Sequence, residues 1–462
     1  MNYECQIGLY GILTIVGVTL MKIHKSAKKA IDLLEEKGYE AYLVGGCVRD
    51  AIMGNTPHDW DICTEALPEE VVRIFHEYTV IETGLQHGTV TVVIEGTALE
   101  ITSYRSDGEY EDNRRPKEVQ FVSSLKEDVS RRDFRMNALA YHPEKGIIDY
   151  FDGVKDIEEK VLRAVGNPNK RFEEDGLRIL RALRFASRLG FSISKDLSEA
   201  IHEKKECLRN ISSERIYSEF VGIIQGEYCK DILLEYRDVI AVFIPEIEAC
   251  FDFSQNNPYH QYDVYRHSIE SVSLVEKEVL LRLTMFFHDI GKPSEHSTDE
   301  KGIDHFYGHS EASVDITRAV LNHLKVDNET KKMVLALIKW HDAEISHKKI
   351  LKWLNRLGEK TLNLLLKVKK ADILAQADVQ KEERLLELLE LEKGISEAIL
   401  KDACFSLRQL MLNGRDLMAI GIKGKEIGET LEEVLQAVID GEIENDPQLL
   451  MKYVRERKRN AS

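Results

Sequence analysis

The stretch that decides the fold is Gly45-Gly46-Cys47-Val48-Arg49-Asp50, followed shortly by His58-Asp59-Trp60-Asp61. Two glycines after the apolar Tyr42-Leu43-Val44 allow backbone N–H groups to approach an anion closely, and Arg49 adds a forked, permanent positive charge. Asp59 and Asp61 are two residues apart, a spacing that places both carboxylates on one face of an extended strand. Because carboxylate oxygens are good Mg²⁺ ligands, the stretch predicts a phosphate site beside a metal site.

Along the rest of the chain, the secondary-structure pattern changes once, from mixed helices and strands to helices alone. Lys25–Lys37 has the periodicity of an amphipathic helix, and from Phe172 onward helical patterns dominate to the end. Strand patterns occur between these two points, at Ala41–Val44, His58–Cys63, Thr89–Ile94 and Leu99–Ser103. We therefore expect an α+β protein, with an α/β head followed by an elongated all-α remainder.

Composition limits the function further. A chain of 462 residues is long enough for about three domains. The net charge of −17 argues against a protein that coats nucleic acid indiscriminately, so any nucleic-acid site must be a local basic patch. The seven cysteines are scattered and form no Cys-x-x-Cys pair, which suits a reducing cytoplasm.

The first 21 residues are apolar but predict no membrane anchor. The uncharged stretch Cys5–Met21 falls just short of the roughly 18 residues of a spanning helix, and it lacks a basic segment before it. We expect residues 1–21 to be a start-site extension or disordered, with Met21 as the true first residue, and we expect no membrane association.

Further charged residues could complete a site for joining nucleotides. Glu100 would add a third carboxylate from a neighbouring strand, although a solvated strand residue is nearly as good an explanation. In Arg131–Asn137, a guanidinium and a carboxylate could bind ribose hydroxyls and phosphate together; the alternative is a surface ion-pair cluster.

Residues Glu174–Arg188 predict a helix that carries four arginines, at 178, 181, 184 and 188. At about 100° per residue these arginines fall within an arc of about 120° and form a basic stripe. An exposed, salt-bridged helix is the alternative, but no acidic residues interleave along that face. The stripe is therefore the local basic patch that a nucleic-acid site needs on a protein with a negative net charge.

These segments together resemble the class II tRNA nucleotidyltransferases of the CCA-adding and bacterial poly(A) polymerase superfamily. The resemblance implies a polymerase-β-like nucleotidyltransferase head, a helical neck, a body and a tail that binds tRNA. The implied boundaries are 22–165 for the head, 166–255 for the neck, 256–380 for the body and 381–462 for the tail. The implied catalytic and Mg²⁺-binding residues are Asp59, Asp61 and Glu100, and the implied nucleotide-binding residues are Gly45, Gly46, Arg49, Arg132, Asp133, Asn137, Asp175, Arg178, Arg181 and Arg184.

In this family, the residues at Asp175 and Arg178 select the incoming base. A carboxylate only accepts hydrogen bonds, so Asp175 favours cytosine and adenine, which present an exocyclic amine, and Arg178 donates to the adjacent ring acceptor. The charged segment Tyr104–Pro116 resembles the family's flexible loop for switching from C to A, with an ordinary disordered loop as the alternative. Ser212–Ile216 resembles a capped helix start that steadies the neck.

A second set of residues predicts a separate metal site. The residues are His267, His288, Asp289 and Asp372, with His309 and His341 at the positions of a second metal. The set resembles the metal-binding residues of HD-superfamily phosphohydrolases, which implies an HD domain with a transition metal. Either a hydrolytic side activity or an ancestral fold with a structural metal would explain it.

We expect an enzyme that adds C, C and A to the 3′ end of tRNA from CTP and ATP, in the cytoplasm and without a DNA partner. The run Leu410–Leu431 resembles the tail of Gram-positive-type CCA-adding enzymes, which favours CCA addition over the alternative of a poly(A) polymerase or A-adding enzyme. An HD phosphohydrolase with a vestigial head is a third alternative, but the intact Asp59 and Asp61 pair argues against it. A noncatalytic RNA-binding protein is the alternative least consistent with the complete set of catalytic residues.

Overall fold

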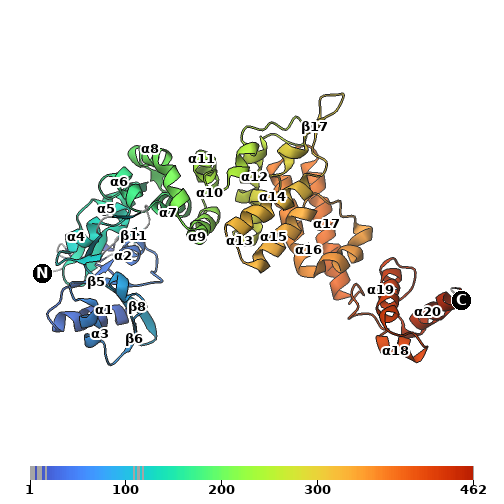
Figure 1. The fold of residues 1–462 in the computed structure, drawn as a ribbon, viewed down its shortest axis with the longest axis horizontal. Coiled ribbons are helices and arrows are strands. Elements are labelled where there is room, and N and C mark those ends of the chain that lie inside the picture. Colours follow the sequence, from blue (N-terminus) through green and yellow to red (C-terminus); the bar gives the residue numbers. More distant parts are fainter. Residues whose placement is uncertain are drawn as a thin grey trace. The chain divides into compact units, whose positions relative to one another are not determined.

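The computed structural model describes residues 6–7, 13–15, 18–107, 110–111, 115–116 and 119–460. The chain forms two compact units, Met1–Pro245 and Glu246–Ser462 (Figure 1). The first unit contains the large sheet and the second is almost entirely helical, so the predicted α+β class is confirmed. The division into head, neck, body and tail stays a prediction. The predictions for residues 1–21 and for the loop at 104–116 fall partly on residues outside the described part.

A seven-stranded sheet forms the centre of the first unit. Its order is β14 (Gly146–Asp149), β13 (Leu139–His142), β4 (Ala41–Val44), β5 (Asp61–Thr64), β8 (Thr97–Ser103), β7 (Thr89–Ile94) and β6 (Thr79–Ile81). Neighbouring strands are antiparallel except β5 and β8, which are parallel. Along β7 every second side chain is fully buried, namely Val90, Val92 and Ile94, because alternate residues point to one face of a sheet.

The predicted strands are confirmed at β4 and β7, and β8 begins slightly earlier than predicted. The prediction of a strand from His58 is wrong, since β5 begins only at Asp61. The ladder with β4 reaches only to Ile62 opposite Leu43, because β4 turns at Gly45 into a helix and offers no partner for residues 58–60. Asp59 therefore lies before the strand, and the shared strand face predicted for Asp59 and Asp61 does not exist.

Helices flank this sheet and continue beyond it. They are α1 (Lys25–Glu36), α2 (Gly46–Ile52), α3 (Pro68–Ile74), α4 (Leu125–Ser130), α5 (Gly153–Glu159), α6 (Pro168–Glu174), α7 (Leu177–Leu189), α8 (Lys195–Lys204), α9 (Ser213–Ile224), α10 (Cys229–Glu235) and α11 (Arg237–Ile240). Short 3₁₀ turns are η1 (Leu85–His87), η2 (Arg135–Asn137), η3 (Lys205–Asn210) and η4 (Pro245–Cys250). Small pairings join β1 (Gln6–Ile7), β2 (Leu13–Ile15) and β3 (Val18–Leu20); β9 (Arg105–Asp107) and β12 (Val119–Phe121); β10 (Tyr110–Glu111) and β11 (Arg115–Pro116); and β15 (Val161–Leu162) and β16 (Ser192–Ile193).

The prediction of one helix over Glu174–Arg188 is wrong at its start. Helix α6 ends at Glu174, Asp175 has extended backbone angles, and α7 begins at Leu177. The backbone at Gly176 lies close to that of Cys207, since a Cβ on Gly176 would lie 2.8 Å from the carbonyl oxygen of Cys207. The break turns Asp175 out of the helix, where its Oδ1 accepts a hydrogen bond from the backbone N of Leu177.

The second unit is built from helices α12 (Val264–Leu274), α13 (Val279–Phe287), α14 (His309–His323), α15 (Asn328–Trp340), α16 (Ile350–Ala375), α17 (Lys381–Leu400), α18 (Gly414–Ala419), α19 (Lys425–Ile439) and α20 (Pro447–Asn460), with 3₁₀ turns η5 (Lys292–Glu295) and η6 (His347–Lys349). Strands β17 (Ser297–Thr298) and β18 (Asp304–His305) form a small pairing. The last three helices share an apolar core that includes Leu417, Leu435 and Leu450. Among the described helices, none combines the length and apolar character needed to cross a bilayer.

Candidate active site

One cavity of about 690 Å³ in the first unit is lined by every residue that the sequence predicts for nucleotide addition. The carboxylates are Asp59, Asp61, Glu100, Asp133 and Asp175; the other predicted residues are Gly45, Gly46, Arg49, Arg132, Asn137, Arg178, Arg181 and Arg184. They come from segments far apart in the chain that meet beside the sheet. Their proximity is a finding, while the role of each residue stays a prediction.

The acidic part of the cavity lies at the start of β5. Asp61 pairs in register with Glu100 on the parallel neighbour β8, so both side chains leave the same face of the sheet. Burial raises the pKa of the Asp61 carboxyl to about 6; nearby Arg132 opposes this effect, and Glu100 and Asp59 reinforce it. Three neighbouring carboxylates, one of them partly buried, favour the binding of a cation.

The glycine pair lies where β4 turns into α2. Gly45 has a φ of +76°, which favours glycine, and a Cβ there would lie 2.6 Å from Nη1 of Arg132. Arg49 on α2 donates from Nη1 to Oδ1 of Asn137 at 2.7 Å and from Nε to Oδ1 of Asp50 at 2.8 Å. The predicted anion-binding arginine is therefore held in place by two side chains.

A buried ion pair joins the second motif to α7. Asp133 is only 8% exposed, and its Oδ2 accepts hydrogen bonds from Nε of Arg181 at 2.8 Å and from Nη2 at 2.7 Å. Its Oδ1 accepts from Nδ2 of Asn137 and from the backbone N of Phe134. Burial alone would raise the pKa of Asp133, but the charge of Arg181 and these hydrogen bonds outweigh burial and lower the pKa to about 2.

The residues predicted to select the base already have partners inside the protein. Asp175 accepts at Oδ2 from Nη2 of Arg215 at 2.9 Å. Arg178 is buried and donates to the Glu174 carboxylate and, from Nη2 at 3.0 Å, to the carbonyl oxygen of Arg131. Such contacts orient both side chains before a nucleotide enters.

The predicted basic stripe on α7 carries ion pairs that its sequence pattern did not predict, because carboxylates from other elements contact two of its arginines. Nε of Arg184 donates to Glu219 on α9 at 2.5 Å, and Arg181 pairs with Asp133. The sequence pattern could not show this, since the acids lie elsewhere in the chain. The ring of Phe185, the next residue after Arg184, forms a cation–π cluster with three guanidinium groups. Their carbons lie 5.5 Å (Arg181), 4.4 Å (Arg184) and 5.2 Å (Arg49) from the ring centre.

Sequence reasoning missed several residues that line the cavity, namely Thr89, Thr102, Arg105, Arg131, Phe185 and Arg215. Arg131 and Arg215 stand inside the segments Arg131–Asn137 and Ser212–Ile216, but no role was predicted for either side chain. Ser212 is the N-cap residue of α9 as predicted, although its side chain makes no capping hydrogen bond. Phe185 has the pattern of an ordinary core residue, and no sequence signal distinguishes it from one.

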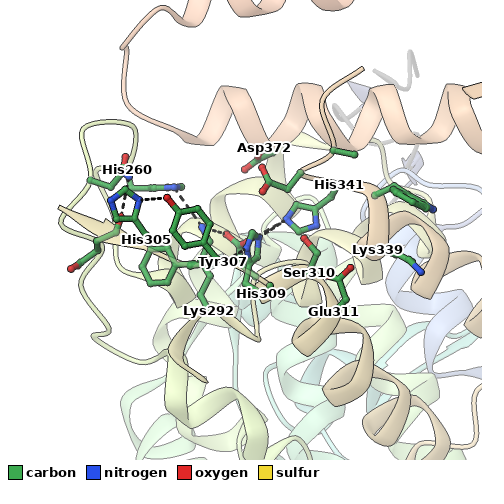
Figure 2. Close-up of a pocket in the computed structure, with 18 of the residues that line it drawn as sticks. His260, Lys292, His305, Tyr307, His309, Ser310, Glu311, Lys339, His341 and Asp372 are labelled. Carbon is green, nitrogen blue, oxygen red and sulfur yellow. Dashed lines mark hydrogen bonds and ion pairs between the residues drawn. The ribbon is translucent and has the colours of Figure 1, made fainter. Parts of the chain in front are cut away.

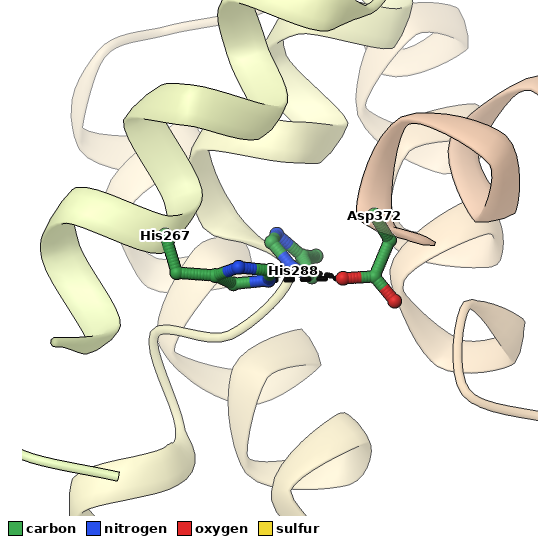
Figure 3. Close-up of side chains that lie close together, drawn as sticks. All are labelled: His267, His288 and Asp372. Carbon is green, nitrogen blue, oxygen red and sulfur yellow. Dashed lines mark hydrogen bonds and ion pairs between the residues drawn. The ribbon is translucent and has the colours of Figure 1, made fainter. Parts of the chain in front are cut away.

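The second unit gathers the predicted histidines and aspartates into one buried cluster, which we call the histidine–aspartate centre. It consists of two groups with ligand atoms within 4.8 Å of one another, His267 with His288 and Asp372, and Asp289 with His309 and His341. Figure 3 shows the first group, in which Nε2 of His267 lies 2.9 Å from Oδ1 of Asp372. All six predicted residues therefore meet.

Asp289 lies between the two groups. Its Oδ2 is 3.2 Å from Nε2 of His288, and its Oδ1 is 3.5 Å from Nε2 of both His309 and His341. Lys292 also contacts Oδ2, at 2.7 Å, and donates to Oε1 of Gln255. An aspartate in this position could contribute one oxygen to each of two metal ions.

The histidine tautomers point to a cation. Nδ1 of His309 lies 2.8 Å from the carbonyl oxygen of Phe306, and Nδ1 of His341 lies 2.6 Å from that of Ile338. A carbonyl oxygen only accepts, so each Nδ1 carries a hydrogen and each Nε2 presents a lone pair. Yet these two Nε2 atoms lie 3.1 Å apart and face each other, as Figure 2 shows. Two lone pairs repel at this distance unless a proton or a metal ion binds between them.

The centre opens into a cavity of about 410 Å³. His309, His341, Asp289 and Asp372 line it together with an outer part that includes Phe306, Tyr307 and Trp340 (Figure 2). Burial lowers the pKa of His288, but the charges of Asp289 and Asp372 outweigh burial and raise that pKa to about 10. The same two negative charges would favour a bound metal ion.

Three family models match separate parts of the chain. The poly A polymerase head domain matches residues 41–163, the probable RNA- and SrmB-binding site of polymerase A matches 190–251, and the putative tRNA nucleotidyltransferase domain 2 matches 298–454. The first match contains the seven-stranded sheet and four of the five carboxylates of the cavity; Asp175 lies beyond it.

Curated relatives match nearly the whole chain. The CCA-adding enzyme of Enterococcus faecalis is 33% identical over 445 residues, covering 95% of this chain and 98% of the relative. That of Lactobacillus helveticus is 34% identical over 433 residues, covering 93% and 96%. The crystal structure of the Bacillus stearothermophilus CCA-adding enzyme in complex with CTP has a TM-score of 0.70 and 27% identity, covering 94% of this chain and 97% of that one. The chain therefore belongs to the CCA-adding enzymes, a family of nucleotidyltransferases.

Proposed function

We propose that the cavity of the first unit adds C, C and A to the 3′ end of tRNA from CTP and ATP, releasing pyrophosphate, in the cytoplasm. One observation supports this most, namely that three carboxylates suited to a metal and the Asp175–Arg178 pair suited to a base line the same cavity. A solved relative is described with CTP. A Thermotoga maritima CCA-adding enzyme that shares the fold, at a TM-score of 0.57 and 20% identity, is described with tRNA.

The metal expected here is Mg²⁺. Asp59, Asp61 and Glu100 supply only hard oxygen ligands, and burial, reinforced by the negative charges of Glu100 and Asp59, raises the pKa of Asp61 despite the opposing charge of Arg132. When bound, Mg²⁺ would neutralise phosphate charge and lower the pKa of the attacking 3′-hydroxyl. Asp59 and Asp61 would hold the Mg²⁺ ion, and Glu100 would be the third carboxylate beside it.

The arginines bind and orient the nucleotide. Arg181, fixed by Asp133, and Arg49, fixed by Asn137, present guanidinium groups with defined directions to the phosphates. Asp175 accepts from an exocyclic amine, and Arg178 donates to the neighbouring ring acceptor. Uracil and guanine would place a carbonyl oxygen against the Asp175 carboxylate, so the same pair favours cytosine and adenine without a nucleic-acid template.

A direct assay tests this proposal. The purified protein is incubated with Mg²⁺ and tRNA that lacks its 3′ CCA, and it receives CTP, ATP or both. We expect two residues to be added with CTP alone and three with both nucleotides. Addition of many A residues from ATP alone would instead favour a poly(A) polymerase, and no addition would refute the proposal.

We further propose that the histidine–aspartate centre binds a transition metal and hydrolyses phosphate esters, as a second activity of the chain. The facing Nε2 atoms of His309 and His341 support this, because imidazole lone pairs around a carboxylate form a common ligand set for such metals. When bound, the metal would polarise a phosphate ester and activate water.

The centre is tested separately from nucleotide addition. Elemental analysis of the full chain should find a transition metal, and 2′,3′-cyclic nucleotides or simple phosphate esters should be hydrolysed. Bound metal without any hydrolysis would favour a structural metal, and absence of metal after loading with Zn²⁺, Mn²⁺, Ni²⁺ or Co²⁺ would refute the site.

A further inference from the structure

We propose that Asp128, which lies outside the nucleotide cavity, is a positioning residue that fixes the arginines of that cavity and the stem of the loop at 104–116. The proposal rests on the proposed function of the cavity. Asp128 is on α4 and is fully buried. No motif predicted a role for it.

Asp128 binds the first arginine of the second motif directly. Its Oδ1 accepts hydrogen bonds from Nε of Arg131 at 3.1 Å and from Nη2 at 2.9 Å. Its Oδ2 accepts no hydrogen bond within the described part of the chain, but Nη2 of Arg132 lies 3.9 Å away. Arg131 and Arg132 both line the cavity, so the charge that neutralises Asp128 comes from the site itself.

From Arg131 the contacts continue to the base-selecting pair. The carbonyl oxygen of Arg131 accepts a hydrogen bond from Nη2 of Arg178 at 3.0 Å. A guanidinium is planar, so fixing one of its nitrogens restricts the directions in which the others can donate. Asp128 therefore binds the side chain of Arg131, while the backbone carbonyl of the same residue binds Arg178.

Asp128 also contacts the start of the loop. Its Oδ1 accepts from the backbone N of Arg105 at 3.3 Å. Arg105 begins β9 and pairs with Phe121 of β12, and these two strands form the stem on either side of the loop. The buried Asp128 carboxylate thus contacts the loop stem at Arg105 and the cavity residue Arg131, whose backbone in turn contacts Arg178.

A purely structural role is the competing explanation, because removing a buried charge from its partners also destabilises a fold. The two explanations differ in which kinetic constant changes. Loss of arginine alignment weakens nucleotide binding and base choice, whereas partial unfolding only reduces the amount of active enzyme and leaves KM unchanged.

The experiment uses the full-length chain with the substitution Asp128→Asn, which keeps the shape and removes the charge. We expect KM for both CTP and ATP to rise about tenfold, the effect of losing a charge-assisted hydrogen bond to a binding residue, with a smaller change in kcat. Misincorporation of UTP and GTP should rise as well. Ser26→Ala is the control, since it removes a buried hydrogen bond, from Ser26 Oγ to the carbonyl oxygen of Ile94, without touching the cavity. It should leave KM and fidelity unchanged.

A second variant keeps the proposal testable if Asp128→Asn does not fold. Arg131→Lys retains the charge but cannot make the paired contact to Asp128, so it should raise KM in the same way. In the double variant the two increases should combine to less than their product, because both act on one contact. Unchanged KM and fidelity in the folded variants, or fully independent effects, would overturn the proposal. Absence of nucleotide addition by the wild-type chain would instead refute the function of the cavity.

Discussion

Replacing Asp133 with Asn should destabilise the first unit by an amount that depends on pH. The ion pair with Arg181 and the hydrogen bond from Asn137 lower the pKa of this buried carboxyl from 3.8 to about 2. Each pKa unit is worth about 1.4 kcal/mol, so the ionised carboxylate contributes roughly 2 kcal/mol to folding. Asparagine would also turn an N–H group toward Arg181, which makes this magnitude a lower bound.

The sign of the pH dependence follows from the direction of the pKa change. Because the folded-state pKa of Asp133 is lowered, its stabilisation is complete above pH 3.8 and is lost as the pH falls through about 2. The difference between wild type and Asp133→Asn should therefore be constant from pH 7 to pH 5. At pH 3, roughly half of it should remain.

Differential scanning calorimetry of the full-length protein would measure this effect. In the wild type, the transition of the first unit is the one that rises on addition of CTP. The Asp133→Asn variant should lower its midpoint by roughly 4–8 °C at pH 7. The control is Asp32→Asn, which removes an exposed ion pair with Lys28 and should not shift the midpoint measurably. An unchanged midpoint in Asp133→Asn, or a deficit that grows as the pH falls, would refute the reasoning.

Three further predictions address the two sites. Asp61→Ala should abolish nucleotide addition while tRNA binding, measured by gel shift, stays intact; addition at the normal rate would contradict the metal assignment. Asp175→Ala or Arg178→Ala should relax discrimination against UTP and GTP by roughly 1–3 kcal/mol in competition assays, and wild-type fidelity in both would place base selection elsewhere. His288→Ala combined with Asp289→Ala should remove the transition metal and any phosphate-ester hydrolysis without stopping CCA addition. Wild-type metal content, or loss of addition in a folded double variant, would show that the assignment or the independence of the sites is wrong.

Much of the candidate site could be predicted from local sequence. The strands β4 and β7 have the predicted bounds, because a run of apolar residues and a period of two are properties of a few neighbouring residues. The identities of the cavity residues were predictable for a related reason. Short patterns indicate which ligand a segment can bind, without knowledge of the fold. Examples are glycines before an arginine, paired aspartates, and arginines at helical spacing.

The ion-pair partners of these residues could not be predicted from local sequence. The arginines of α7 look unpaired along the sequence, yet Asp133 and Glu219 neutralise Arg181 and Arg184 from 48 and 35 positions away. A helical wheel contains no information about a neighbouring helix. The break at Asp175 was missed as well, and the close approach of Gly176 to Cys207 beside it is a contact between distant segments that the local pattern does not show.

The sequence by itself therefore determined the class of fold, the family resemblance and the set of residues that carry the chemistry, because these depend on composition, periodicity and short spacings. Only the tertiary structure decided that Glu100 lies beside Asp61, that Asp59 lies outside the strand, and that Asp289 lies between two histidine groups. It also decided that Asp128 binds Arg131, a residue that lines the cavity. The physical reason is that strand register, burial and ion pairing are set by contacts between distant segments, which form together only when the chain folds.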